Sequence, residues 1–464
     1  MRAIFRLAFA HVLSDNGKMK PAKRPKRYKP DRLDASAITP EVVAKWWSPR
    51  FGETNPQRMN NPLWEWLVRT RMHAYNARER FGFPSPWDES KPGPAWCFAR
   101  FGQSVTLLPD GRVVMIAGEH EDFYDPDFKI YNDVTVQHPD GSLDLYGYPE
   151  NVFPPTDFHT ATLVGDRIII IGNNGYLESK TEKPAQVAEL NLETWSMRLI
   201  ETHGDQPGWL HDHVAALSDD GHTITIMGGI TVPVAEKGEG FRENPDEWSL
   251  DLKTLQWRRL SAKPWETYVL SSSELRDLGL FNLRSLPWAV ECGHGMPASA
   301  EVSLEELVPG SIWEDFQNRF GKCNRYAKEA AAELYQKGFV PDLEIIRHLY
   351  HPPVPYRDLP EVREEEESEV HDEDGPFDWD EDDYSRRGDD FNGTRIDVQG
   401  VVVRYKEEGS RLSVIFEGTL PMDMVASIVG DLAQKLELLV RKPVLVQSLD
   451  SAAWKKVDDA SNDH

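Results

Sequence analysis

Histidine and carboxylate side chains gather at two places in the middle of this sequence. Glu119, His120, Glu121 and Asp122 follow one another directly; His211, Asp212 and His213 form a second group, with His159 at a comparable place one repeat earlier. Zinc and copper are bound in proteins by imidazole nitrogen and carboxylate oxygen. One hypothesis is therefore a metal-dependent enzyme with ligands among His120, His159, His211 and His213.

A second interpretation of these groups needs no metal. His159 and His213 would form hydrogen bonds between neighbouring repeats, and the acidic run after Gly118 would be a solvated loop. We favour this interpretation, because the sequence contains no GxSxG, P-loop, HExxH or dinucleotide-binding motif. We therefore assign no catalytic residue, no metal and no cofactor, and expect a protein that is not an enzyme.

The totals set limits on the class of protein. A chain of 464 residues with 40% apolar residues predicts two or three domains with buried cores. The formal net charge of −25 argues against nucleic-acid binding by the folded body. Cys97, Cys292 and Cys323 form no CxxC pair, and the sequence has no apolar run long enough to cross a membrane. We expect a cytoplasmic protein with no membrane contact.

The elements that must position the histidines form a repeat. "LLPDGRVVMIAG", "LVGDRIIIIG" and "LSDDGHTITIMGG" each join a tight turn to an apolar run that ends at Gly118, Gly172 or Gly228. A second strand pair follows each run, with Trp195 and Trp257 in what we take to be matching places. Each copy of about 50–56 residues predicts four short antiparallel strands, the period of a propeller blade.

These motifs resemble kelch repeats, in which a glycine pair follows an apolar strand and an aromatic residue lies in the fourth strand. Gly228, Gly229 and Trp257 match this pattern fully; Gly172 has Ile171 before it, and Gly118 has Ala117 before it. The resemblance covers residues 99–260 and implies a kelch-like β-propeller. Related folds include a copper oxidase, which makes an oxidase-like enzyme the enzymatic alternative.

Only three repeats are visible, whereas propellers close with four or more blades. Flanking helices could cap the open arc, two chains could form a ring as a homodimer, or further blades could have diverged. We favour capping, because both flanks are rich in apolar helix and tryptophan.

The long connections of such a repeat should meet at one end, because the second connection of each meander and the link to the next lie on the same side. The residues there that we expect to bind a partner are Glu119, His120, Asp122, Asn173, Asn174, Trp209 and His211. Loops on a rigid scaffold usually carry recognition. Trp209 would be an anchor for the partner if exposed and a packing residue between repeats if buried.

The remaining chain divides by composition. We predict a basic flexible arm over 1–40, a helical, tryptophan-rich segment over 41–98, a helical segment over 261–360, an acidic disordered linker over 361–392 and a small ββαβ domain over 393–464. Within 41–98, Asn61 and Pro62 predict the start of a helix that runs to Gly82. The fold class is mainly β with helical flanks and a small α/β domain.

Three functions follow as hypotheses. The first is a non-enzymatic scaffold that binds an unidentified protein or peptide at the long loops. The second is the metal-dependent enzyme described above. The third is an immunity or antitoxin protein that binds a basic partner, which fits the acidic composition but no specific motif.

Overall fold

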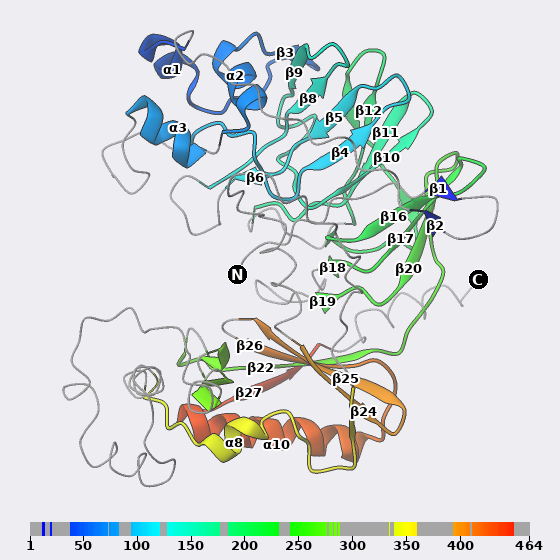
Figure 1. Ribbon diagram of the computed structural model, residues 1–464. Coiled ribbons are helices and arrows are strands. Elements are labelled where there is room, and N and C mark those ends of the chain that lie inside the picture. The colour runs from blue at the N-terminus through cyan, green and yellow to red at the C-terminus, as the bar shows by residue number, and fades with distance from the viewer. Residues whose placement is uncertain are drawn as a thin grey trace. The chain divides into compact units, whose positions relative to one another are not determined.

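The computed structural model describes residues 12–13, 19–20, 38–72, 74–82, 94–120, 128–176, 184–231, 242–275, 278–281, 283–284, 286–287, 334, 338–359, 393–408 and 411–449 (Figure 1). The chain divides into an N-terminal unit, Ile4–Ala262, and a C-terminal unit, Lys263–His464 together with Met1–Ala3. The protein is mainly β and is built from antiparallel sheets. In the described part of the chain these sheets do not close into a barrel or propeller.

Among the sheets that the structure describes in the N-terminal unit, three are built on four strands that pair in sequence order. The first sheet has β4 (Ser104–Leu107), β5 (Val113–Ile116), β8 (Val134–Gln137) and β9 (Leu143–Gly147). The second has β10 (Thr160–Val164), β11 (Arg167–Ile171), β12 (Val187–Asn191) and β13 (Met197–Leu199). The third has β16 (Val214–Leu217), β17 (Thr223–Met227), β20 (Glu247–Asp251) and β21 (Gln256–Arg259). The predicted strand meanders are confirmed.

The last strand of each four-stranded meander has a contact partner on its outer side. β3 (Gln57–Arg58) pairs with β9, and β14 (His203–Gly204) pairs with β21. β13 has no strand partner on its outer side in the described residues, but the Asn55 amide both donates to Met197 O at 2.7 Å and accepts from Met197 N at 2.8 Å. An uncovered edge would invite pairing with another chain, so these contacts keep the sheets separate from other strands.

The register between the sheets corrects two predicted equivalences. Ile116, Ile171 and Met227 occupy the same ladder position, so Gly172 matches Ala117 and Gly228, whereas Asn173 matches Gly118 and Gly229. Met197 pairs with Leu190 as Trp257 pairs with Leu250, so Trp195 corresponds to Leu255 and does not match Trp257. The prediction was wrong because Trp195 lies two residues before its fourth strand, whereas Trp257 lies within its own fourth strand.

Trp195 has a different packing role. Its ring stacks on Tyr146 of the first sheet, with centroids 5.4 Å apart, within an apolar cluster that joins the first two sheets. Trp257 is buried in the third sheet and its Nε1 donates to Thr202 Oγ1 at 3.2 Å.

The segment before the first sheet forms α1 (Pro40–Trp46), α2 (Pro62–Thr70) and α3 (Ala74–Phe81). The Asn61 side chain accepts from Leu63 N and Trp64 N, which confirms the predicted helix start. The predicted single helix over 61–82 is wrong, because Arg71 takes a left-handed φ of 52° and ends α2. Trp64 stacks on Trp96 at 4.7 Å in a cluster that packs on Met115 and Leu145 of the first sheet. Trp64 and Trp96 are therefore packing residues between the helical segment and the first sheet.

The C-terminal unit is a six-stranded antiparallel sheet with helices packed on one face (Figure 1). Its order is β23 (Arg357–Asp358), β24 (Gly393–Val398), β25 (Val401–Glu408), β26 (Arg411–Phe416), β22 (Glu266–Ser271) and β27 (Leu445–Ser448). Its helices include α8 (Leu343–Arg347) and α10 (Met422–Val440). The helix of the predicted ββαβ domain is thus present as α10, and its apolar side chains Val425, Ile428, Val429, Leu432 and Leu436 are buried.

The sheet differs from the predicted ββαβ unit in two respects. Within residues 393–464 three strands precede α10 where two were predicted, and β22 and β23 come from the segment predicted as helical over 261–360. β22 lies between β26 and β27, so these two strands run parallel on either side of it.

Several predictions lie outside the described residues. These are Asp122, Cys292, Cys323, the acidic linker over 361–392 and most of the basic arm, in which Val12–Leu13 (β1) pairs with Met19–Lys20 (β2). A search of the described helices finds none with the length and apolar character needed to span a membrane.

Candidate functional site

The three sheets are joined by the segments that lead into their first strands. Gly102, Phe158 and Asp212 occupy equivalent positions, and all three adopt a left-handed φ, of 61°, 49° and 56°. Phe158 N donates to Gly102 O at 3.0 Å, and Asp212 N donates to Phe158 O at 2.9 Å. The same backbone hydrogen bond therefore repeats from the first sheet to the second and from the second to the third.

A second repeated bond involves the histidines. His159 Nε2 lies 2.8 Å from Ser104 Oγ, and His213 Nε2 lies 2.9 Å from Thr160 Oγ1. Each histidine thus bonds to the first residue of the preceding sheet's first strand. The interpretation that these histidines link neighbouring repeats is confirmed.

The burial of both histidines determines their charge. Desolvation lowers the pKa of His159 to about 3, and it lowers the pKa of His213 to about 3 with smaller contributions from His211 and His159. Both imidazoles are therefore neutral near pH 7. Among the residues that the structure describes, no group of three or more His, Cys, Asp or Glu side chains is arranged to hold a metal ion.

Four of the expected binding residues are buried and tie the long connections together. Asn173 donates from Nδ2 to Pro155 O at 3.0 Å and accepts at Oδ1 from Asp157 N at 3.1 Å. Trp209 is 7% exposed and its Nε1 donates to Asn174 O at 3.1 Å. His120 is buried in β6 (Glu119–His120), which pairs with β7 (Lys129–Ile130).

His211 is buried in β15 (Leu210–His211) against β18 (Ile230–Thr231), and its Nδ1 lies 2.9 Å from Asp212 Oδ2. β18 also pairs with β19 (Arg242–Glu243). Trp209 and His211 therefore hold connections in place, and the packing interpretation of Trp209 is confirmed.

Only some of the side chains that reach the surface at this end are among the expected binding residues. Phe128 and Tyr176 form an edge-to-face pair with centroids 5.7 Å apart, and Tyr176 Oη accepts from Ile130 N at 2.9 Å. Both are partly exposed, as are Glu119 and Asn174, and Glu150 is exposed. We call Glu119, Phe128, Lys129, Glu150, Asn174 and Tyr176 the connector surface.

The pKa shifts of Tyr176 and Lys129 include contributions from carboxylates of this surface, so these side chains lie near one another. Burial raises the pKa of Tyr176, and the carboxylates of Asp157, Glu150 and Glu119 raise it further. Burial lowers the pKa of Lys129, which Glu150 partly offsets, and Lys129 Nζ lies 4.7 Å from the centre of the Phe51 ring. An aromatic pair flanked by carboxylates can hold a basic or apolar side chain of a partner.

Sequence reasoning found Glu119 and Asn174 but missed Phe128, Lys129, Glu150 and Tyr176. All four lie in the long connections, where no repeat position singles out one side chain. The signal that could have found Phe128 and Tyr176 was the presence of aromatic residues within the long connections, four in residues 119–132 and one in residues 173–186.

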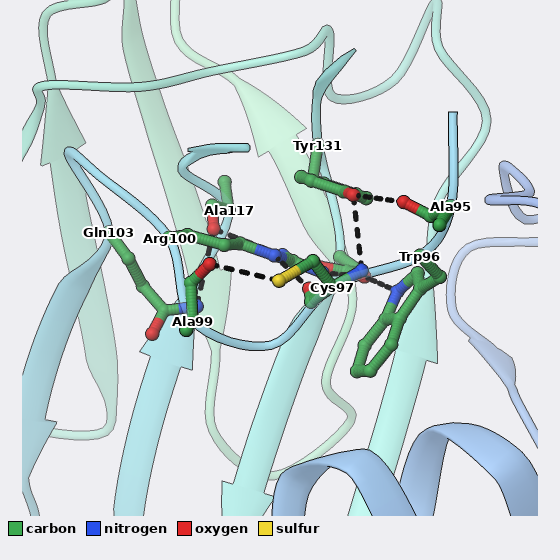
Figure 2. A network of polar contacts seen from close by, with 9 residues as sticks. Ala95, Trp96, Cys97, Ala99, Arg100, Gln103, Ala117 and Tyr131 are labelled. Atoms are coloured by element: carbon green, nitrogen blue, oxygen red, sulfur yellow. Dashed lines mark hydrogen bonds and ion pairs between the residues drawn. The ribbon is translucent and has the colours of Figure 1, made fainter. Parts of the chain in front are cut away.

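A buried polar network supports the connection that leads into the first sheet (Figure 2). The Arg100 guanidinium forms an ion pair with Asp133, and its Nη1 donates to Ala117 O at 3.0 Å. Arg100 lies on the Tyr131 ring, 3.6 Å from its centre, and Trp96 Nε1 donates to Asp133 Oδ2 at 2.8 Å. Burial alone would lower the pKa of Arg100, but Asp133 outweighs this and raises it.

The network in Figure 2 continues to the backbone on both sides. Tyr131 Oη donates to Ala95 O at 2.8 Å and accepts from Cys97 N at 3.1 Å. The buried Cys97 thiol lies 3.1 Å from Ala99 O. These contacts fix the turn at Ala117 and Gly118, from which the connection bearing Glu119 departs.

Comparison of the chain with protein-family models gives no match, and comparison with curated proteins gives none either.

Proposed function

We propose that residues 99–260 form a three-bladed, kelch-like arc that binds a protein segment at the connector surface. The arc is supported by two hydrogen bonds that repeat between successive sheets, from Phe158 and Asp212 in the backbone and from His159 and His213 in the side chains. The first strands β4, β10 and β16 lie next to one another in that order. Both features are expected of blades around a common axis.

The first blade of this arc is capped by the N-terminal helices. α2 and the tryptophan cluster pack on Met115, Leu143 and Leu145, which lie on the face of the first sheet that points away from the second. A further blade would need that face. This favours capping over ring closure by a second copy at the first sheet.

The observation that carries the binding proposal is the meeting of separate long connections. Ile130 N bonds to Tyr176 Oη, and Asn174 O accepts from Trp209 Nε1, so loops from the first and second sheets and the link to the third are held together. The surface formed there combines aromatic rings, an amide, two carboxylates and the Lys129 ammonium group on a rigid base. We infer a partner segment with basic and apolar side chains, because Glu119 and Glu150 flank the Phe128–Tyr176 pair.

Site-specific photocrosslinking tests this proposal. A photoreactive amino acid at Glu150 or Asn174 should capture a defined partner in extracts of the native host. The matched controls carry it at Asp110 or Asp220, which are exposed in the tight turns, and these should not capture that partner. Equal capture from the turns, or capture that persists after Tyr176→Ala and Glu119→Ala, would contradict the proposal.

A further inference from the structure

β27 is the last strand of the C-terminal sheet and all four of its residues are exposed. Leu445 is 52% exposed and Val446 is 45% exposed. In the described part of the chain β27 pairs with β22 on one side and with no strand on the other. Two apolar side chains and a row of backbone groups therefore lie at an open sheet edge.

The last strand of each meander and the long strand β24 each have a further contact on their outer side. β9 is covered by β3, β21 by β14, β24 by β23, and β13 by the Asn55 amide. Exposed edges are commonly protected by lysine, proline or a bulge. The sequence LVQS of β27 has no charged residue and no proline, and its ladder to β22 has no bulge.

The register identifies which backbone groups face outward. Leu449 N donates to Thr267 O, and Gln447 is opposite Val269, so the odd-numbered residues of β27 direct their N–H and C=O groups toward β22. In an antiparallel ladder the direction alternates with each residue. The N–H and C=O groups of Val446 and Ser448 therefore point away from the sheet.

We propose that β27 pairs antiparallel with β27 of a second copy of this chain, with the two Gln447 residues opposite each other. In this register Val446 and Ser448 of one copy exchange hydrogen bonds with Ser448 and Val446 of the other. Leu445 of one copy lies opposite Leu449 of the other on the face shared with Gln447. The two C-terminal sheets join into one continuous sheet.

A second copy fits this edge better than a charged peptide. The pairing sets leucine against leucine and glutamine against glutamine, and no charged side chain of Leu445–Leu449 meets another. Cross-strand apolar pairs stabilise a ladder, whereas like charges directly opposite destabilise it. Because the chain carries a net charge of −25, association should strengthen as salt screens the repulsion between copies.

Sedimentation velocity of the full chain over a range of concentrations tests the proposal. Val446→Pro removes an outward N–H and leaves the bonds to β22 intact, so two of the four hydrogen bonds between copies are lost. We expect the dimer dissociation constant to rise about tenfold or more. Val446→Thr keeps the N–H and should leave the constant within about threefold.

A charge exchange at Gln447 tests the register. Gln447→Lys and Gln447→Glu should each weaken the homodimer about two- to fivefold, and an equimolar mixture should form the heterodimer preferentially. Unchanged circular dichroism spectra would show that the variants are folded. A chain that stays monomeric at all concentrations, or a dimer that Val446→Pro leaves unchanged, would overturn the proposal; a mixture with no heterodimer preference would overturn the register.

Discussion

At the scale of single residues, the ends of the apolar strands depend on close backbone approach. A Cβ on Gly172 would lie 2.6 Å from Leu210 O and 2.7 Å from His213 Cε1, at a φ of +88°. Gly165 in the same sheet has a φ of +61° and open space around it. The two glycines therefore separate steric contact from backbone preference.

We predict that Gly172→Ala lowers the free energy of unfolding by about 2–4 kcal/mol, because both the contact and the φ are unfavourable. Gly165→Ala should cost about 1 kcal/mol, from the φ alone. Denaturant unfolding monitored by tryptophan fluorescence measures both. Equal costs would show that the contact between Gly172 and His213 relaxes freely.

The buried histidines predict a pH dependence of stability. The pKa of His159 and that of His213 are about 3 in the folded protein, against about 6.5 when unfolded, so the unfolded chain binds more protons between these values. Their contribution is fully present above pH 6.5 and is lost as the pH falls toward 3. The free energy of unfolding should fall by up to about 1.4 kcal/mol per pH unit for each histidine.

Unfolding at pH 7 and pH 5 measures this loss, and the variant His159→Gln/His213→Gln is the comparison. Glutamine can still bond to Ser104 or Thr160 but does not titrate. The variant should lose less stability between the two pH values than the natural chain. The same loss in both proteins would assign the pH dependence to other groups.

At the scale of elements, the network around Arg100 joins the segment after α3 to the first sheet. Removal of one partner from a buried ion pair leaves an uncompensated charge, which costs about 3–5 kcal/mol. We predict a loss of this size for Asp133→Ala, measured by denaturant unfolding. Asp110→Asn breaks the more exposed pair with Arg112 and should leave stability unchanged within error.

The edge of the second sheet depends on a single side chain. Asn55→Ala should leave Met197 N and Met197 O without the amide and cost about 1–2 kcal/mol. Asn55→Asp can still accept from Met197 N but cannot donate to Met197 O. Hydrogen exchange should therefore show an unprotected Met197 amide in the alanine variant and a protected one in the aspartate variant.

Local sequence signals predicted much of the fold but not its long-range pairing. The tight turns and apolar runs predicted the three meanders, and the predicted ββαβ domain contained the helix observed as α10. The assignment of β22 to the C-terminal sheet could not be predicted, because its partners β26 and β27 lie far away in the sequence. The amide cover from Asn55 and the pair of Arg100 with Asp133 have no periodic signature either.

The sequence predicted where the candidate site lies, but only some of the side chains that form it. Alternation in a meander required the long connections to share one end, and contacts such as that of Ile130 with Tyr176 agree with this. Which side chains are buried depends on packing between connections. Asn173, expected to face a partner, instead bonds to another connection, and Trp209 takes the packing role that its burial implies.

At the scale of the whole molecule, each unit has its own apolar cores. One cluster lies entirely within residues 270–440, whereas the other two lie within residues 38–197. We predict that fragments 4–262 and 263–464 each unfold cooperatively when prepared alone, because neither needs the other's core. Calorimetry of each fragment tests this, and the absence of a transition in either fragment would contradict it.

The position of β22 also matters during synthesis of the protein. β22 ends at Ser271, and its partner in β26 begins at Arg411, so about 140 further residues must be added before the pair can form. At ~5–20 residues/s the ribosome takes roughly 7–30 s to make them. Nascent β22 stays that long without its strand partners, and a transcript cut short before codon 411 yields a polypeptide that contains β22 but neither β26 nor β27.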